Sequence, residues 1–284
     1  MGRIERFGSI LVAGAITCMV VFAQAEPVQE ETETMVQAQV VLTVAEGKRL
    51  IAKAIPQMPI VKQALENGMV VVARGTTNTY VAEELLDRKI PHGAFVAGRT
   101  YPEKNAKKLK DAEPMREIVL VKGQLQQDLS LDQAVRKLKP GDVVIKGANA
   151  LDHDRKLAAV VAASADGGTT GTILPYLGAR KAHLVIPVGL EKQVAGDVVD
   201  IARKMRQPVK SLNWVPTMFL LPGEVFTELE AIELLTGVQV FQAAAGGIGG
   251  AEGSMRLVLR GSRSKVEAAL EFTEQVQGEP PFVE

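Results

Sequence analysis

The sequence predicts an α/β fold: a mostly parallel, Rossmann-like sheet with helices on both faces, followed by a small C-terminal ferredoxin-like α+β unit. Short apolar runs rich in Val and Ile recur along the chain, and segments with helical spacing separate them. Strands separated by helices favour right-handed crossovers and parallel pairing. The composition of the 284 residues, 46% hydrophobic and 23% charged, is typical of a globular protein that buries a core.

The first two helices are predicted before the sheet begins. Residues 44–54 and 59–65 have apolar side chains at helical spacing. Thr43 and Glu46 have the Thr-x-x-Glu spacing of a capping box, and Gly68 follows the second segment. Both ends of this helical region therefore have recognisable boundary residues.

Strands and helices then alternate. The expected strands cover residues 69–73, 93–97, 118–121, 142–145 and 183–188. The expected helices cover residues 80–87, 131–137, 154–164 and 195–205. Ligands of such sheets bind beyond the carboxyl ends of the strands, so the turns that follow the strands are the first places to look for a site.

The pattern changes near residue 223. The segments expected there are a helix at 224–235, a strand at 238–243, a glycine-rich loop at 246–253, a strand at 255–261 and a helix at 264–276. This order predicts a small α+β domain over residues 223–284. Residues 39–222 are then the Rossmann-like domain.

The N-terminus has the layout of a secretory signal peptide. Arg3 and Arg6 precede an apolar run at residues 10–22, and Ala23-Gln24-Ala25 offers small residues for cleavage. We therefore expect a signal peptide over residues 1–25, a disordered acidic spacer over 26–38, and export to the periplasm or the extracellular space. The alternatives are an uncleaved membrane anchor at residues 10–22, or a cytoplasmic protein whose true start lies further along. Cys18, the only cysteine, lies in the apolar run, so a cleaved chain would contain no thiol.

Three turns share one kind of chemistry. The first holds Arg74, Gly75, Thr76, Thr77, Asn78 and Thr79, the second holds Lys146, Gly147 and Asn149, and the third holds Gly167, Gly168, Thr169 and Thr170. Free N–H groups at a helix start, hydroxyl groups and cationic side chains all suit an anion. If the strands are parallel, these turns can gather at one edge and bind an anionic small molecule. The alternative is that they are ordinary loop turns with Gly, Thr and Asn at their usual positions.

A fourth turn ends the strand at residues 183–188. Glu191 and Lys192 stand there at the start of a predicted helix. A glutamate at this position suits the helix dipole, whereas a lysine there is unfavourable without a partner. Lys192 is therefore a candidate ligand contact, although a solvated charged pair explains the two residues equally well.

Several function classes are disfavoured. Lys plus Arg and Asp plus Glu both number 33, and aromatic residues make up 4%, so neither charge nor stacking favours nucleic acid. We expect no metal and no cofactor, since the acids and histidine of Asp152-His153-Asp154 are adjacent and do not converge on one centre. The loop at 246–253 lacks the order of a P-loop. A membrane contact is expected only through an uncleaved N-terminal segment.

The turns in order resemble those of the superfamily that includes ribose-5-phosphate isomerase, glucosamine-6-phosphate deaminase and the CoA transferases, over roughly residues 45–200. Residues 75–79 fall where this group has a Gly/Ser/Thr phosphate loop, and residues 167–171 where it has a glycine-rich loop. Residues 143–152 are similar to the isomerases' strand and Asp-Gly-Ala-Asp-Glu-x-Asp turn. Residues 184–192 resemble a later strand that ends in Asp-Glu-Ser-Lys.

The resemblance implies a sugar-phosphate ligand and isomerase-like chemistry, with Asp152 as the acid or base. Lys146, Asn149 and Ala150 replace three acids of the isomerase turn, and the Arg-Glu-Lys that carries the isomerases' base has no counterpart. We therefore expect a protein that binds a small anionic, phosphorylated metabolite, and whether it is an enzyme stays open. The alternatives are a non-catalytic sensor module and a structural homo-oligomeric protein.

Overall fold

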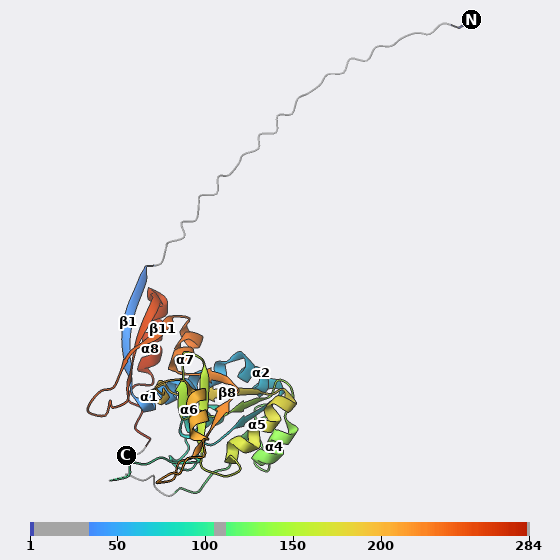
Figure 1. Ribbon diagram of the computed structural model, residues 1–284. Helices are drawn as coiled ribbons and strands as arrows, with labels where there is room; N and C mark the ends of the chain where they lie inside the picture. Colours follow the sequence, from blue (N-terminus) through green and yellow to red (C-terminus); the bar gives the residue numbers. More distant parts are fainter. Residues whose placement is uncertain (3–33, 105–111, 283–284) are drawn as a thin grey trace. The chain divides into compact units, whose positions relative to one another are not determined.

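Residues 1–2, 34–104 and 112–282 are the part of the chain that the computed structural model describes (Figure 1). The expected signal peptide, apart from its first two residues, and residues 26–33 of the expected spacer lie outside the described residues. The internal contacts group Thr34–Glu284 as one unit. No helix in the described ranges combines the length and the apolar character that crossing a membrane requires.

The central sheet has six strands in the order β10-β8-β5-β2-β3-β4. Their bounds are β2 (Met69–Val72), β3 (Ile118–Val121), β4 (Gln124–Leu125), β5 (Val143–Ile145), β8 (His183–Pro187) and β10 (Glu224–Phe226). Strands β10, β8, β5 and β2 pair in parallel, and β3 and β4 extend the sheet as antiparallel strands. The α/β class is confirmed, in the form of a mixed sheet with a parallel centre.

Helices pack against this sheet from both sides. The helices of this part are α1 (Val44–Ala54), α2 (Pro59–Asn67), α3 (Thr76–Leu86), α4 (Leu131–Lys137) and α5 (Gly168–Arg180), with a short 3₁₀ turn, η1 (Ile55–Gln57), after α1. Figure 1 shows α2 on one side of β8, and α4 and α5 on the other. The capping box at Thr43 and Glu46 is confirmed, and so are the bounds predicted for α1 and α4.

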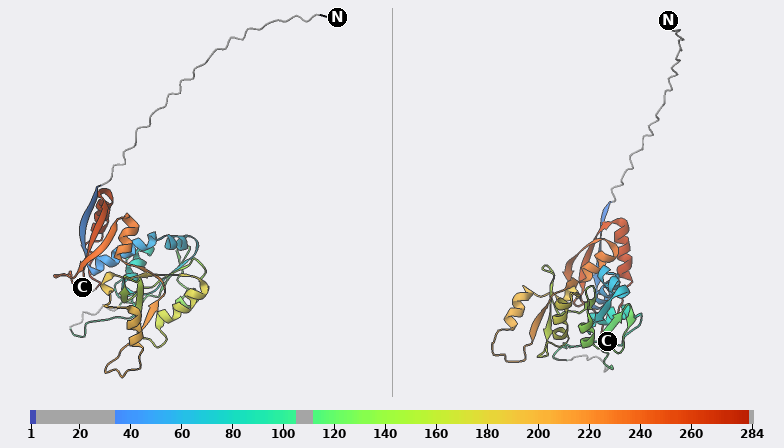
Figure 2. Two further views of the ribbon diagram at one scale, coloured as in Figure 1. Left: turned by 45° about the horizontal axis from the view of Figure 1, so that its top comes forward. Right: turned by 90° about the vertical axis from the view of Figure 1, so that its right-hand side faces the viewer.

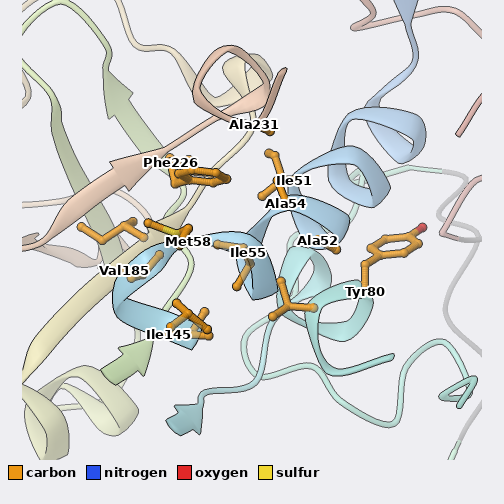
Figure 3. Packing of buried hydrophobic residues seen from close by; sticks show 14 of the residues in the cluster. Ile51, Ala52, Ala54, Ile55, Met58, Tyr80, Ile145, Val185, Phe226 and Ala231 are labelled. Atoms are coloured by element: carbon orange, nitrogen blue, oxygen red, sulfur yellow. The ribbon is translucent and has the colours of Figure 1, made fainter. Parts of the chain in front are cut away.

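Helix α1 lies inside the core. Ile51 and Ile55 are fully buried and lie between Phe226 of β10 on one side and Tyr80 of α3 on the other (Figure 3). Burying one such side chain stabilises a fold by about 1.5–3 kcal/mol. Because the helix is covered on nearly all sides, its charged residues Lys48 and Arg49 are buried as well.

A second sheet has the antiparallel order β6-β7-β9, with β6 (Ala150–Asp152), β7 (Leu157–Ala162) and β9 (Thr217–Leu221). Helix α6 (Val198–Met205) packs on it. The helix predicted at residues 154–164 is wrong, because this segment is the hairpin turn and strand β7. Its Ala-Ala-Val-Val run finds backbone partners on both sides, in β6 and β9, and β-branched residues suit that setting.

Two further predictions need correction. The strand expected at residues 93–97 is wrong: Gly93 has a φ of 99°, and the N–H of Ala94 donates to the carbonyl of Pro91, so the chain turns there. The helix expected to begin at residue 224 begins later. Residues 224–226 form β10 beside β8, and Thr227 then caps α7 (Glu228–Thr236) with its side chain.

A third sheet has the order β1-β12-β11. It consists of β1 (Met35–Leu42), β11 (Gln239–Ala245) and β12 (Met255–Ser262), and α8 (Arg263–Glu274) packs on β1 and β12 (Figure 2). The order helix, strand, strand, helix is present, but β1 adds a strand from the other end of the chain. Residues 35–38 of the expected spacer are therefore ordered, because β1 pairs with β12 along its whole length.

Candidate functional site

Four parallel strands of the central sheet end at one edge, and chemically active residues follow each of them. The Gly75 turn follows β2, Lys146 follows β5, Glu191 and Lys192 follow β8, and Glu228 follows β10. The ladder continues briefly beyond the strands: the N–H of Lys146 donates to the Val185 carbonyl at 3.0 Å. This carboxyl edge is where open α/β sheets bind ligands.

Five side chains form what we call the lysine–glutamate cluster: Lys48, Lys146, Glu191, Lys192 and Glu228. Lys48 comes from α1 and interacts electrostatically with Glu191, Lys192 and Glu228. Lys146 interacts with Lys192, and Glu228 with Glu191. Charges of both signs from three strand ends and one core helix therefore meet at one place.

Glu228 is the most deeply buried member, with 0% of its surface exposed. Its Oε2 accepts the backbone N–H of Leu190 at 3.0 Å, whereas its Oε1 is buried without a hydrogen-bond partner in the described residues. Burial, and then the negative charge of Glu191, raise the pKa of Glu228 to about 8. At neutral pH the carboxyl group is therefore largely protonated.

Glu191 is also poorly satisfied. Both of its carboxylate oxygens are buried, and neither has a hydrogen-bond partner in the described part of the chain. The nearest cation is Lys192, whose Nζ lies 3.9 Å from Oε1. Lys192 has 26% of its side chain exposed against 13% for Glu191, so solvent reaches the cluster from the Lys192 side. Buried oxygens without a hydrogen bond are costly, and they mark Glu191 as a group with unused hydrogen-bonding capacity.

Burial disfavours the charged form of the two deeper lysines. Burial, followed by the charge of Lys192, lowers the pKa of Lys146 to about 8. Its Nζ donates to the neighbouring Gly147 carbonyl at 3.1 Å. Burial lowers the pKa of Lys48 as well, although Glu191 opposes that shift. Within the described ranges, neither lysine has a carboxylate within ion-pair distance.

Two glycines give the carboxyl groups their space. A Cβ on Gly47 would lie 2.5 Å from Oε1 of Glu228, and a Cβ on Gly189 would overlap the carboxylate of Glu191. The same atom on Gly189 would also lie 3.0 Å from Oε1 of Glu228. Any larger residue at either position would displace a carboxyl group, so the two glycines are part of the cluster's geometry.

The Gly75 turn is partly used by the fold. The Asn78 amide nitrogen donates to the carbonyls of Ala73 and Ile145, at 2.7 and 3.2 Å, and joins the ends of β2 and β5. Thr79 donates through Oγ1 to the Gly75 carbonyl, while Arg74 pairs with Glu117 at 3.0 Å. These contacts explain the shape of the turn without a ligand.

Part of the Gly75 turn nevertheless remains available. The backbone N–H groups of Thr76, Thr77 and Asn78 start α3, and no hydrogen bond joins them to the described residues. Oδ1 of Asn78 is likewise buried without a partner in that part of the chain. A Cβ on Gly147 would lie 3.8 Å from this oxygen, so the first and second turns are adjacent.

The third turn already holds an anion of its own. Gly167 and Gly168 have positive φ values, and Thr169 and Thr170 lie in the first turn of α5. The carboxylate of Asp166 accepts the N–H of Gly168 at 2.8 Å and also the hydroxyl of Ser164. The contacts of Gly167 include Phe219 of β9, in the second sheet. No contact with Lys146 or the Gly75 turn is recorded for these described residues.

Asn149 and Asp152 hold the β6–β7 hairpin. Oδ1 of Asn149 accepts the N–H of Val161 at 2.7 Å, and Oδ1 of Asp152 accepts the N–H of Arg155 at 3.2 Å. Neither side chain has a recorded contact with the lysine–glutamate cluster among the described residues. A ligand or catalytic role for either residue stays a prediction.

The opposite edge of the central sheet has a depression of about 1240 Å³, lined by Met69, Lys122, Asp142 and Arg180 among others. Its buried acid is already satisfied, because Asp142 accepts the N–H groups of Met69 and Lys139. We therefore place the candidate site at the carboxyl edge, where charged groups lack partners. Within the residues that the structure describes, no group of three or more His, Cys, Asp or Glu could hold a metal ion.

Sequence reasoning found Lys146 and Lys192 but missed Lys48 and Glu228. The sequence signal for Lys48 was a basic residue that follows Gly47 in a helix whose next apolar residues are Leu50 and Ile51. Glu228 was hidden because residues 224–226 were assigned to the helix rather than to a strand. Comparison with known proteins adds no assignment: no protein-family model matches the chain, and no curated protein and no solved structure matches it.

Proposed function

We propose that the lysine–glutamate cluster binds the anionic group of a small metabolite, with a phosphorylated sugar as the first candidate. The observation that carries the proposal is an excess of basic side chains over ionised carboxyl groups at the carboxyl edge of the sheet. Three lysines face two carboxyl groups, and the raised pKa of Glu228 leaves that group neutral at pH 7. Burying unbalanced charge costs free energy, and an anionic ligand would compensate it.

The placement of the cluster supports the same proposal. It lies where parallel strands end, and the free N–H groups of Thr76 and Thr77 start a helix of eleven residues close by. Helix N-termini at this edge are suited to phosphate. The parallel centre of the sheet agrees with the Rossmann-like arrangement and with the resemblance to sugar-phosphate isomerases, and both remain proposals. The ferredoxin-like description of the C-terminal unit has the same standing.

The chemistry that the cluster supports is proton transfer. Aldose–ketose isomerisation needs a base that takes a proton from the carbon next to a carbonyl and an acid that protonates the carbonyl oxygen. The raised pKa of Glu228 keeps a proton on that group beside the carboxylate of Glu191, so two adjacent carboxyl groups supply an acid and a base. We infer that these glutamates, rather than Asp152, would carry such a reaction.

Binding can be tested by thermal shift on the purified full chain. Inorganic phosphate, ribose 5-phosphate and glucose 6-phosphate are the probes, with ribose and glucose as uncharged controls. We expect at least one phosphorylated probe to raise the Tm, and Lys146→Gln and Lys192→Gln to remove that shift. Lys62→Gln is the matched control, because Lys62 is exposed on α2. If no phosphorylated probe raises the Tm, the anion site is wrong.

Catalysis needs a separate test. The protein is incubated in ²H₂O with any sugar phosphate that shifts the Tm, and uptake of deuterium at the carbon next to the carbonyl is followed by NMR. Exchange that Glu191→Gln and Glu228→Gln abolish would support isomerase-like chemistry. Binding without exchange would instead identify the non-catalytic sensor that the sequence left open.

Export is proposed on the sequence alone. Mass spectrometry of the protein from its natural source gives the mature N-terminus and any co-purifying small molecule in one measurement. A chain that begins at Glu26 would establish cleavage after Ala25. A chain that retains residues 10–22 would instead favour the membrane anchor. A chain that lacks residues 10–22 and begins at a residue other than Glu26 would favour the cytoplasmic alternative.

A further inference from the structure

The connection between α6 and β9, residues 206–216, exposes an unusual concentration of large apolar side chains; we call it the apolar loop. Val209, Leu212, Trp214 and Val215 are 72%, 100%, 68% and 51% exposed. Figure 2 shows this connection, amber on the colour bar, projecting away from the sheets. A solvent-exposed Leu or Trp on its own needs no explanation, but four such residues within seven positions indicate an interaction surface.

The loop is held at both ends and free in the middle. At the end of α6 the N–H of Gln207 donates to the Lys204 carbonyl at 3.2 Å, and β9 pairs with β7 over five residues. Arg206 donates to the Met218 carbonyl at 3.3 Å and so closes the base of the loop. The fold therefore presents the loop without covering it.

The charged residues of the loop and of its immediate flanks in the sequence are all cations. Residues 201–223 contain four cations, Arg203, Lys204, Arg206 and Lys210, and no Asp or Glu. Asp200 pairs with Arg203 and Lys204 on α6, whereas Lys210, which lies among the apolar residues, has no recorded ion pair with the part of the chain that the structure describes. This local excess is hidden in the zero net charge of the whole chain.

We propose that the apolar loop binds an anionic membrane surface. Trp and Leu at its tip would enter the interfacial layer, and the flanking Lys and Arg would meet lipid phosphate groups. Apolar and aromatic residues beside cations are the combination that interfacial membrane binding uses. Basic residues near such a surface are attracted by its anionic lipids, and the exposed apolar side chains add the free energy of leaving water.

The charges favour a lipid surface over a second copy of this chain. Two copies that met through this loop would bring Lys210 and Arg206 of each against cations of the other, with no carboxylate in residues 201–223 to pair with them. An anionic bilayer supplies the complementary charge. The proposal is independent of the lysine–glutamate cluster, whose residues lie on other elements.

The chain contains one tryptophan, so its fluorescence reports on this loop alone. The full chain is mixed with vesicles of phosphatidylcholine, with or without a minority of phosphatidylglycerol. We expect a blue shift of Trp214 emission, and quenching by brominated lipid, only with the anionic vesicles and only at low salt. Leu212→Ser and Lys210→Glu should each weaken the partition coefficient roughly tenfold.

Ile248→Ser is the matched control, because Ile248 is 89% exposed in a different loop and its replacement should leave the partition coefficient unchanged. Trp214 emission that stays unshifted while the protein sediments with the vesicles would overturn the proposal, because the N-terminal segment would then account for binding. A blue shift that grows with protein concentration in the absence of lipid would overturn it in favour of a second copy.

Discussion

The backbone N–H of Leu190 donates to Oε2 of Glu228 at 3.0 Å, and this bond joins the turn after β8 to the first residue of α7. A helix start and a hydrogen-bond donor both favour an ionised carboxylate. Complete burial and the adjacent charge of Glu191 act in the opposite direction and prevail, so the pKa of Glu228 is raised. Glu228 is therefore held in position by one oxygen and kept protonated by its surroundings.

The protonation of Glu228 predicts how stability depends on pH. In the unfolded chain this carboxyl group ionises near its ordinary value of 4.5, whereas in the folded protein it ionises near 8. Between those values the folded state holds the extra proton, so Glu228 makes the free energy of unfolding fall as pH rises. Glu228→Gln should remove that fall, because Gln keeps the acceptor for Leu190 and cannot ionise.

Urea unfolding of both proteins at pH 5 and pH 8 measures this difference. The free energy of unfolding of Glu228→Gln minus that of the wild type should increase by several kcal/mol between pH 5 and pH 8. Comparing the two proteins cancels the groups that titrate in both. Parallel pH profiles for the two proteins would show that Glu228 ionises normally.

Lys146 should make the free energy of unfolding rise with pH, the opposite of the effect of Glu228. Its pKa is lowered to about 8 by burial and by Lys192, so at pH 7 its charge is present at the expense of stability. Lys146→Met should raise the free energy of unfolding at pH 7 by about 1–3 kcal/mol, as for other buried charges replaced by apolar side chains. The same variant should lose the phosphate-induced Tm shift. Lys62→Met, at an exposed position, should change neither quantity, and a destabilised Lys146→Met would mean that the lysine is structurally required.

Replacing Gly189 by alanine should impair ligand binding, although the substitution adds only a methyl group. Gly189→Ala places a methyl group into the carboxylate of Glu191 and against Oε1 of Glu228, so both groups must shift. We expect a loss of ligand-induced Tm shift at least as large as that of Lys192→Gln. Gly178→Ala is the matched control, since no heavy atom lies within 4 Å of its Cβ position in α5. That substitution should stabilise the protein by about 0.5–1 kcal/mol through helix propensity.

The sequence predicted local structure well where local chemistry decides it. The Thr43–Glu46 capping box fixed the start of α1, and the Val-rich run at β2 fixed a buried strand. The helix prediction for residues 154–164 failed because β7 is a strand only through its partners: β6, across a turn, and β9, which is distant in the sequence. Local periodicity cannot report such a partner.

The residues of the candidate site also fall into two groups, those that the sequence could predict and those that only the tertiary structure reveals. Lys146 and Lys192 follow strands that the sequence revealed, so their common edge could be inferred. Lys48 belongs to the site only because α1 is buried among α3 and α7, and a lysine in a helix is normally solvated. Glu228 required β10 to be recognised first. The charges that define the site are therefore set by tertiary burial, which residue type alone does not disclose.

Arg49 holds a second buried network, formed with Glu83, Glu84 and Glu279 at 2.5, 2.9 and 2.9 Å. Burial acts against ionisation of Glu83, but hydrogen bonds from the Ile90 N–H and from Arg49 prevail and lower its pKa. Arg49→Met would leave Glu83, which is 5% exposed, with only the solvent-exposed Lys89 as a cationic partner among the described residues, at 3.3 Å. We expect a loss of about 3–5 kcal/mol in the free energy of unfolding, measured by urea denaturation.

The Arg49 network also holds the C-terminal residues against the core. Sensitivity to carboxypeptidase measures this role separately from global stability. Glu279 pairs with Arg49, and Phe282 stacks on His92 at 4.3 Å between ring centroids. Glu279→Gln should leave global stability nearly unchanged and make the last residues more sensitive to carboxypeptidase, because Glu83 and Glu84 still neutralise Arg49. Arg136→Met removes an exposed pair with Asp132 and should alter neither measurement. If Glu279→Gln destabilises the protein as much as Arg49→Met, the C-terminal segment unfolds together with the core and does not detach from it independently.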